Sequence, residues 1–215
     1  MKLLDLLKEN KGTVSSSLGK ELAQQVLEGN TDLIVEAIDL TSYDSANIKS
    51  KSIRAGAAKI VEKVAEKKPE QVAPYLNKLL PALEMPEPQT RWMIILVFGY
   101  CMKQNPDIAL KGIDFARKYI EENRGVCLSG AAHLYLGRAG AVSEAKAGKV
   151  FPVLINALEK ASVNELDWII EAFINMSDKL TKSEKELLKN TVKLYSDAHK
   201  KSTIKRINKL LKKLT

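Results

Sequence analysis

Residues 69–83 read PEQVAPYLNKLLPAL and carry the clearest structural pattern in the chain. Within this stretch Leu76, Leu79 and Leu83 recur at the three- and four-residue spacing of one helix face. The preceding residues, back to Lys51, show the same helical spacing of apolar side chains. Because a proline cannot continue a helix from the turn before it, the sequence predicts two helices separated by a break at Pro69.

The same arrangement returns along the chain with a period of 37 or 38 residues. The stretch Pro88–Gly125 again reads helix, break, helix, and its break at Pro106 lies 37 residues after Pro69. Matched apolar positions of the second helices are Leu76, Leu79 and Leu83, then Ile113, Ala116 and Ile120, then Phe151, Leu154 and Leu158. Those of the first helices are Ala57, Ile60 and Val61, then Ile94, Val97 and Phe98, then Ala131, Leu134 and Tyr135, then Ile169, Ala172 and Phe173. Four such units fit between Lys51 and about Lys200.

Signals for strands are missing, because β-branched and aromatic residues do not alternate with polar ones and no Asn-Gly or Asp-Gly turn joins two apolar segments. The chain is punctuated instead by helix breaks at Gly29-Asn30, Pro69, Pro86, Pro88, Pro106, Asn123-Arg124-Gly125 and Gly137 to Gly140. Thr31 is predicted to cap the helix that follows the first of these breaks. The fold class is therefore predicted to be all-α.

A period near 38 residues with two helices in each period is typical of an α-solenoid. A single helical hairpin cannot bury its apolar face, and stacking the next hairpin on it does. We therefore expect a right-handed superhelix of about five hairpins that forms one domain over residues 1–215. Residues 1–50 would form irregular cap hairpins, residues 51–200 the four repeats, and residues 201–215 a basic C-terminal cap helix, with Ser202 as its N-cap.

The units resemble HEAT and armadillo-type repeats. The closest piece is residues 69–83, with its leucine pairs and prolines, which resembles a second HEAT helix. Thr90-Arg91 followed by Trp92-Met93-Ile94-Ile95 resembles the start of the next first helix. The third and fourth units depart from the pattern, with Gly137 to Gly140 and Thr181-Lys182-Ser183 in place of a proline turn. The resemblance implies a helical-repeat fold that binds partners, and it implies no chemistry.

The composition is that of an ordinary globular protein, with 215 residues of which 45% are hydrophobic and 28% charged. Two cysteines are too few for a disulfide framework, which favours a reducing compartment and a cytoplasmic location. No run of 18 uncharged apolar residues is present, so no transmembrane segment is expected. The first residues, MKLLDLLKE, are interrupted by acidic side chains and do not match a secretory signal.

Positive charge is concentrated at the C-terminal end. Residues 179–215 hold 12 basic and 3 acidic side chains, a net charge of +9, whereas the rest of the chain carries −1. Such a field can attract an acidic protein, a nucleic acid or a lipid surface, and it is equally typical of a solvated cap helix. Lysines far outnumber arginines, and the last helix has no aromatic residue, which disfavours phosphate clamping, base stacking and membrane insertion.

A second basic surface is expected on the second helices, which line the concave side of HEAT-type stacks. Lys111 and Lys149 are 38 residues apart and are predicted to occupy equivalent places on adjacent units. Acidic residues intervene, so mixed solvated faces are the competing interpretation. The candidate binding residues are Lys111, Arg117, Lys149, Lys189, Lys193, Lys205 and Arg206.

No catalytic motif was found. The sequence lacks a phosphate-binding glycine loop, a Gly-x-Ser-x-Gly elbow and any metal-ligand spacing of His and Cys, so no metal or cofactor is expected. His133 lies among small residues and is interpreted as a satisfied packing histidine. Cys101 and Cys127 are interpreted as buried free thiols. Cys127 and His133, six helical positions apart, point to different sides and form no dyad.

These observations predict a non-enzymatic scaffold that binds a protein or peptide, of acidic character, on its concave face and basic end. The alternative is a nucleic-acid binder similar to the HEAT-like DNA glycosylases of alkylation repair. Asp167-Trp168 and Arg91-Trp92 are the tryptophan sites with neighbouring charge that this alternative requires.

Overall fold

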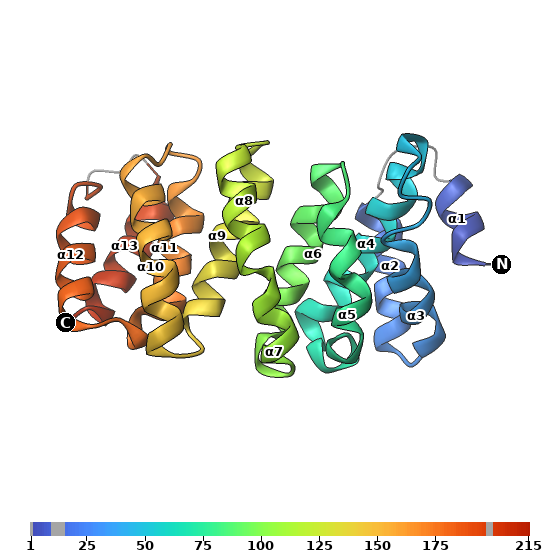
Figure 1. Ribbon diagram of the computed structural model, residues 1–215, viewed down its shortest axis with the longest axis horizontal. Helices are drawn as coiled ribbons and strands as arrows, with labels where there is room; N and C mark the ends of the chain where they lie inside the picture. The colour runs from blue at the N-terminus through green and yellow to red at the C-terminus, as the bar shows by residue number, and fades with distance from the viewer. Residues whose placement is uncertain (1, 10–15, 197–199) are drawn as a thin grey trace. The chain divides into compact units, whose positions relative to one another are not determined.

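The computed structural model describes residues 2–9, 16–196 and 200–215, and every regular element in these residues is a helix (Figure 1). The prediction of an all-α fold is confirmed.

The chain forms two compact units, Met1–Gly112 and Ile113–Thr215. The first unit contains α1 (Leu3–Glu9), α2 (Ser16–Leu27), α3 (Thr31–Leu40), η1 (Ile48–Ser50), α4 (Lys51–Lys67), η2 (Pro69–Gln71), η3 (Ala73–Tyr75), α5 (Leu76–Leu79), η4 (Leu80–Glu84), α6 (Pro88–Tyr100), η5 (Cys101–Lys103), α7 (Pro106–Ala109) and η6 (Leu110–Gly112). The second contains α8 (Ile113–Glu122), α9 (Val126–Gly140), α10 (Glu144–Glu159), α11 (Leu166–Met176), η7 (Ser177–Lys179), α12 (Lys182–Lys193) and α13 (Lys201–Lys213).

In the first unit, α4 packs against both α2 and α6 (Figure 1). Helices α2 and α4 run parallel, because Gly19 near the start of α2 lies against Lys59, whereas Leu27 at its end accepts a hydrogen bond from Lys68 at 3.0 Å. Their approach is close: a Cβ on Gly19 would lie 2.8 Å from the Lys59 Cγ. The buried Leu7 of α1 lies against α4 at Gly56.

The second helix predicted over residues 69–83 is not one continuous α-helix. Pro69, Pro74 and Pro81 each stand near the start of a separate 3-10 turn, and only the four residues of α5 between them are α-helical. Each proline lacks the N–H that an α-helix would use, and so it restarts the turn. The expectation of a break at Pro69 is correct, whereas the two prolines that follow it break the predicted helix further.

A buried ion pair fixes the start of α4 to the start of α6. The Arg54 side chain is fully buried and donates from Nε and Nη2 to the two carboxylate oxygens of Glu87, each at 2.8 Å. Its Nη1 donates to the carbonyls of Tyr43, Asp44 and Asn47. Burial alone would raise the pKa of Glu87, but the bonds from Arg54 and from the Thr90 hydroxyl outweigh it and lower that pKa.

In the second unit, α11 packs against both α9 and α13. Glycines of α9 allow the close approach of α11: a Cβ on Gly137 would overlap the Ala172 carbonyl oxygen, and one on Gly130 would lie 2.7 Å from the Trp168 ring. The helix continues through the break predicted over Gly137 to Gly140 and ends at Gly140. Gly137 lies against the backbone of α11, and Gly140 lies against the side chains of Met176 and Val150.

Helix ends elsewhere follow the predicted breaks, with two capping corrections. Gly125 at φ 104° precedes α9, and Thr181 forms a capping box with Glu184 at the start of α12. Thr31 is the first residue of α3 rather than its cap. Ser202 likewise lies inside α13, and its hydroxyl donates to Asp167 at 3.3 Å.

The matched apolar positions are buried in both units, except that Leu134 and Ile120 are half-buried. Hydrogen bonds also join positions about one period apart. In the first unit Arg54–Glu87, Cys101–Pro69, Asn105–Ala73 and Lys68–Leu27 are 32 to 41 residues apart. In the second unit Arg117–Lys149, Ser129–Glu165, Thr203–Asp167 and Tyr195–Leu158 are 32 to 37 apart. These separations lie on both sides of the predicted period of 37 or 38 residues in the first unit and at or just below it in the second.

Candidate functional site

The C-terminal candidates lie on the outer faces of α12 and α13. Lys193 is exposed and Lys189 half-exposed on α12, and Lys205 is exposed on α13. Helix α13 turns Ile207 and Leu210 inward, so its basic side chains are left on the opposite side. An open depression of about 440 Å³ on this side is lined by Lys205, Asn208, Lys209, Lys212 and Lys213.

Arg206 is held by acidic side chains of α11. Its guanidinium lies 3.4 Å from Asp167 and 3.4 Å from Glu171, and Lys209 lies 4.0 Å from Glu171. The Thr203 hydroxyl donates to Asp167 at 2.7 Å. Arg206, predicted to contact a partner, therefore also attaches α13 to α11.

Two lysines of α13 differ from Arg206 in this respect. Within the described residues, no carboxylate lies at ion-pair distance from Lys205 or Lys212. Lys213, in contrast, lies 3.5 Å from Asp178. The α13 depression therefore has uncompensated positive charge at Lys205 and Lys212.

The expected inner-face residues are brought together only in part. Arg117 of α8 donates to the Lys149 carbonyl of α10 at 2.9 Å, while the Lys149 side chain is exposed. Lys111 is exposed in the η6 turn of the first unit, whereas Lys149 lies within a long helix. The local structures at Lys111 and Lys149 therefore differ, although the two residues match in sequence spacing.

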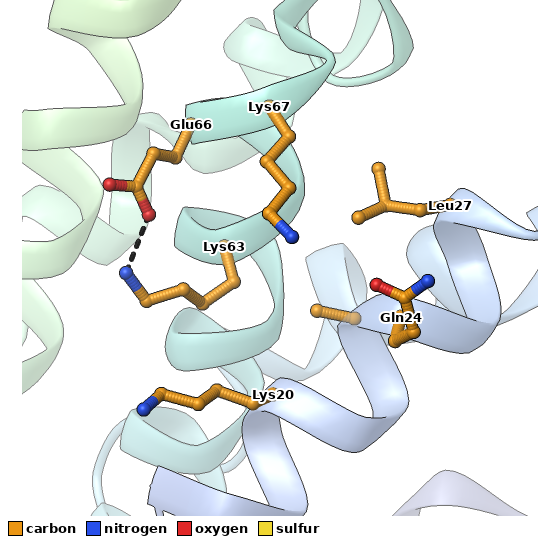
Figure 2. A pocket seen from close by; sticks show the side chains of 7 residues that line it. Lys20, Gln24, Leu27, Lys63, Glu66 and Lys67 are labelled. Carbon is orange, nitrogen blue, oxygen red and sulfur yellow. Dashed lines mark hydrogen bonds and ion pairs between the residues drawn. The ribbon is translucent and has the colours of Figure 1, made fainter.

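A further basic site lies between α2 and α4 in the first unit. A cavity of about 310 Å³ there is lined by Lys20, Ala23, Gln24, Leu27, Lys63, Glu66 and Lys67. Figure 2 shows Lys20 toward one end and Lys67 with Leu27 toward the other, and the Lys67 ammonium reaches from α4 toward α2. Ala23 forms a buried apolar floor.

The middle of this cavity is neutralised within the molecule. Lys63 lies 2.6 Å from Glu66 and 3.3 Å from Glu62. Burial would lower the pKa of Lys63, but the bonds to Glu66 and Glu62 outweigh it and raise that pKa. Sequence reasoning missed this site, since its lysines belong to first helices. The signal was the recurrence of Lys59, Lys63 and Lys67 every four residues, which places them on one helix face.

The groups considered for reactivity in the sequence are one histidine and two cysteines. His133 is buried as predicted, and burial lowers its pKa to about 4 against the opposing charge of Glu165. Neither ring nitrogen has a hydrogen-bond partner in the described part of the chain, so the expectation that this histidine is satisfied is not met. Burial raises the pKa of Cys101 to about 12. Cys127, predicted to be buried, is exposed because it lies on the first turn of α9.

The tryptophans named for the glycosylase alternative serve helix packing. Trp168 lies against Gly130, and the Lys59 ammonium lies 5.5 Å from the centre of the Trp92 ring. In residues 2–9, 16–196 and 200–215, no group of three His, Cys, Asp or Glu side chains could hold a metal ion. The described helices include none with the length and apolar character that crossing a membrane requires.

No protein-family model and no curated protein matches the sequence. Among solved structures, the chain is similar to a crystal structure of an engineered protein from the Northeast Structural Genomics Consortium, with a TM-score of 0.63 and 14% identity over 99% of this chain and 95% of that one. It is also similar to a second engineered protein from the same consortium, with a TM-score of 0.59 and 15% identity, and it spans 57% of that longer chain. At these identities the similarity concerns the fold alone.

Proposed function

We propose that the chain is a HEAT/armadillo-like α-solenoid acting as a non-enzymatic interaction module that binds an acidic segment of a protein partner at its basic C-terminal end. Three features support the solenoid: alternate helices pack together in each unit, most matched positions of the period are buried, and hydrogen bonds join residues 33 and 36 apart, close to the period. A stack of repeats offers a long binding surface without needing a deep pocket.

The binding proposal is based on the uncompensated positive charge on α13. Arg206, Lys209 and Lys213 have carboxylate neighbours, whereas Lys205 and Lys212 have none within ion-pair distance among the described residues. These two ammonium groups line the same open depression with the aliphatic stems of neighbouring lysines. A carboxylate from a partner would supply the missing counter-charge and leave the ion pairs to α11 in place.

The chemistry of this surface favours an acidic protein over a nucleic acid. Arginine is the side chain that clamps phosphate through two bonds, and the single arginine of α13 is already engaged by Asp167 and Glu171. The helix has no aromatic side chain on which a base could stack. Lys111, Arg117 and Lys149 remain predicted contributors on the inner face.

The test measures binding of fluorescent poly-glutamate to the full chain by anisotropy. The double variant Lys205→Gln/Lys212→Gln is compared with Lys49→Gln/Lys103→Gln, which removes two exposed lysines of the first unit and keeps the same net charge. We expect the first variant to bind about tenfold more weakly than the second, with affinity falling as salt rises. Equal binding by the two variants would exclude the α13 surface. Binding of duplex DNA without binding of poly-glutamate would favour the nucleic-acid alternative.

A further inference from the structure

The cavity between α2 and α4 lies in the other compact unit from the α13 lysines. We propose that it is a second recognition site, which takes a short extended acidic peptide containing an aliphatic side chain. This inference is independent of the α13 surface, since it uses different residues on different helices.

Two separated positive charges define the ends of the cavity. Lys63 is neutralised by Glu62 and Glu66, but in the part of the chain that the structure describes neither Lys20 nor Lys67 has a carboxylate at ion-pair distance. Lys20 and Lys67 come from different helices and lie toward opposite ends of the cavity (Figure 2). A ligand that satisfies both therefore needs two anionic groups with a spacer between them.

The floor between these lysines is apolar. Ala23 is 2% exposed and Leu27 is half-buried. Lys20 and Leu27 are seven residues apart on α2, which is about 10 Å along a helix axis. Side chains of an extended peptide alternate between two sides at about 3.3 Å per residue, so every second side chain can face the cavity. A segment with acidic side chains at its first and fifth residues and an aliphatic one at its third, which spans about 13 Å, would place each group on a complementary part of the cavity.

Helix polarity distinguishes a peptide carboxylate from a phosphate. Because α2 and α4 run parallel, both present their C-terminal ends at the Leu27 and Lys67 end of the cavity. The negative ends of both helix dipoles lie there, and the Leu27 carbonyl already accepts a hydrogen bond from Lys68, whereas phosphate sites use N–H groups at helix starts. None of the described residues that line the cavity is an arginine. A doubly charged phosphate is therefore opposed more strongly than a singly charged carboxylate that pairs with one lysine.

The experiment titrates the full chain with a blocked Glu–Leu peptide, in which Glu, Leu and Glu occupy alternate positions with Ser between them, and records amide chemical shifts. The test variant is Lys20→Gln/Lys67→Gln, which changes two exposed side chains and leaves the Lys63 pairs intact. The matched control is Lys49→Gln/Lys103→Gln, and a third protein carries Lys205→Gln/Lys212→Gln. Inorganic phosphate and the matching Gln–Leu peptide are titrated in parallel.

We expect the Glu–Leu peptide to shift amides of α2 and α4, and the Lys20/Lys67 variant to bind about tenfold more weakly than the control. The α13 variant should keep this binding, so that loss of the α13 function and loss of this site are told apart. Equal affinity of the Lys20/Lys67 variant and the control overturns the proposal. Equal binding of the Gln–Leu peptide also overturns it, as does a preference for phosphate at these lysines.

Discussion

In each unit, the fourth residue of one helix (α4 or α9) bonds to a glutamate just before a neighbouring helix, but the two bonds are made by different groups. The fourth residue of α4, Arg54, bonds to Glu87 immediately before α6, and the fourth residue of α9, Ser129, bonds to Glu165 immediately before α11. The first link consists of two charge-assisted bonds of 2.8 Å, whereas the second is a single hydroxyl bond of 3.4 Å. The same helix position can therefore be filled by side chains of very different size and charge.

Glycines lie at the contact between α9 and α11 in the second unit. Gly137 lies against the backbone of α11, and Gly130 lies against the Trp168 ring. The buried basic group there is the neutral His133, one turn after Ser129. In the first unit the bulkier Arg54 is fully buried and also donates hydrogen bonds to three backbone carbonyls that precede α4. The helix contact thus includes a hydrogen-bonded buried ion pair in the first unit and close packing at glycines in the second.

The largest effect should come from removing the buried charge of the first unit. Arg54→Ala leaves Glu87 buried without its partner, and we expect a loss of about 4 kcal/mol in the free energy of unfolding. Urea denaturation measures it. The control is Lys78→Ala, because the Lys78–Asp39 pair at 3.2 Å is exposed and should be worth less than about 0.5 kcal/mol. A similar loss in both variants would remove the distinction between buried and exposed pairs.

The corresponding test of the second unit is Gly137→Ala. The new Cβ would overlap the Ala172 carbonyl oxygen of α11, so the two helices must separate, at a cost of about 3 kcal/mol. Gly148→Ala is the matched control, since the nearest atom, Glu184 Oε1, is 3.9 Å away and alanine favours a helix by about 1 kcal/mol. Thermal melts should therefore move in opposite directions, and a stable Gly137→Ala protein would contradict the close-packing account.

His133 should give the second unit a pH dependence that Arg54 does not give the first. Its pKa in the folded protein is about 4, below the ordinary 6.5, so the unfolded chain binds the proton more readily. Stability is then unaffected above pH 6.5 and falls by up to about 1.4 kcal/mol per pH unit between 6.5 and 4. Urea denaturation at about pH 7 and about pH 5 should show this slope in the parent chain and a reduced one in His133→Leu. An unchanged slope in His133→Leu would mean that other titrating groups cause the dependence of stability on pH.

The smallest effect is expected for Ser129→Ala. The bond to Glu165 is long, and Glu165 retains its bonds from the hydroxyl and backbone N–H of Ser162, which are the main cause of its lowered pKa. We expect a loss of about 0.5 kcal/mol in chemical denaturation. A loss as large as that of Arg54→Ala would make the two links energetically equivalent and remove the contrast between the units.

Sequence periodicity predicted the fold class and most of the buried positions, because apolar spacing reports directly which helix face is covered. The prediction failed where one residue type is compatible with two different local structures. Glycines at 137 and 140 are typical of a break, but here Gly137 fits the backbone of α11 and Gly140 fits the side chains of Met176 and Val150, which only the structure reveals. Pro74 and Pro81 were included in a predicted helix, although each removes a backbone donor from it.

Candidate site residues were harder to predict, since whether a lysine is free to bind a partner depends on the charged groups near it in the folded chain. Arg206 and Lys205 are adjacent in sequence, yet Arg206 faces two carboxylates of α11 and Lys205 faces none among the described residues. The α2–α4 cavity is lined by Lys20 and Lys67, which belong to two helices far apart in sequence. No spacing rule within one helix predicts that both line one cavity.

The most direct test of the proposed role is chemical-shift mapping of poly-glutamate on the full chain. The account predicts that the largest changes fall on α13 around Lys205 and Lys212, and that they disappear in the Lys205→Gln/Lys212→Gln variant while the Arg206 contacts to α11 persist. Poly-glutamate that leaves the α13 amides unshifted, or that shifts them equally in this variant, would contradict it.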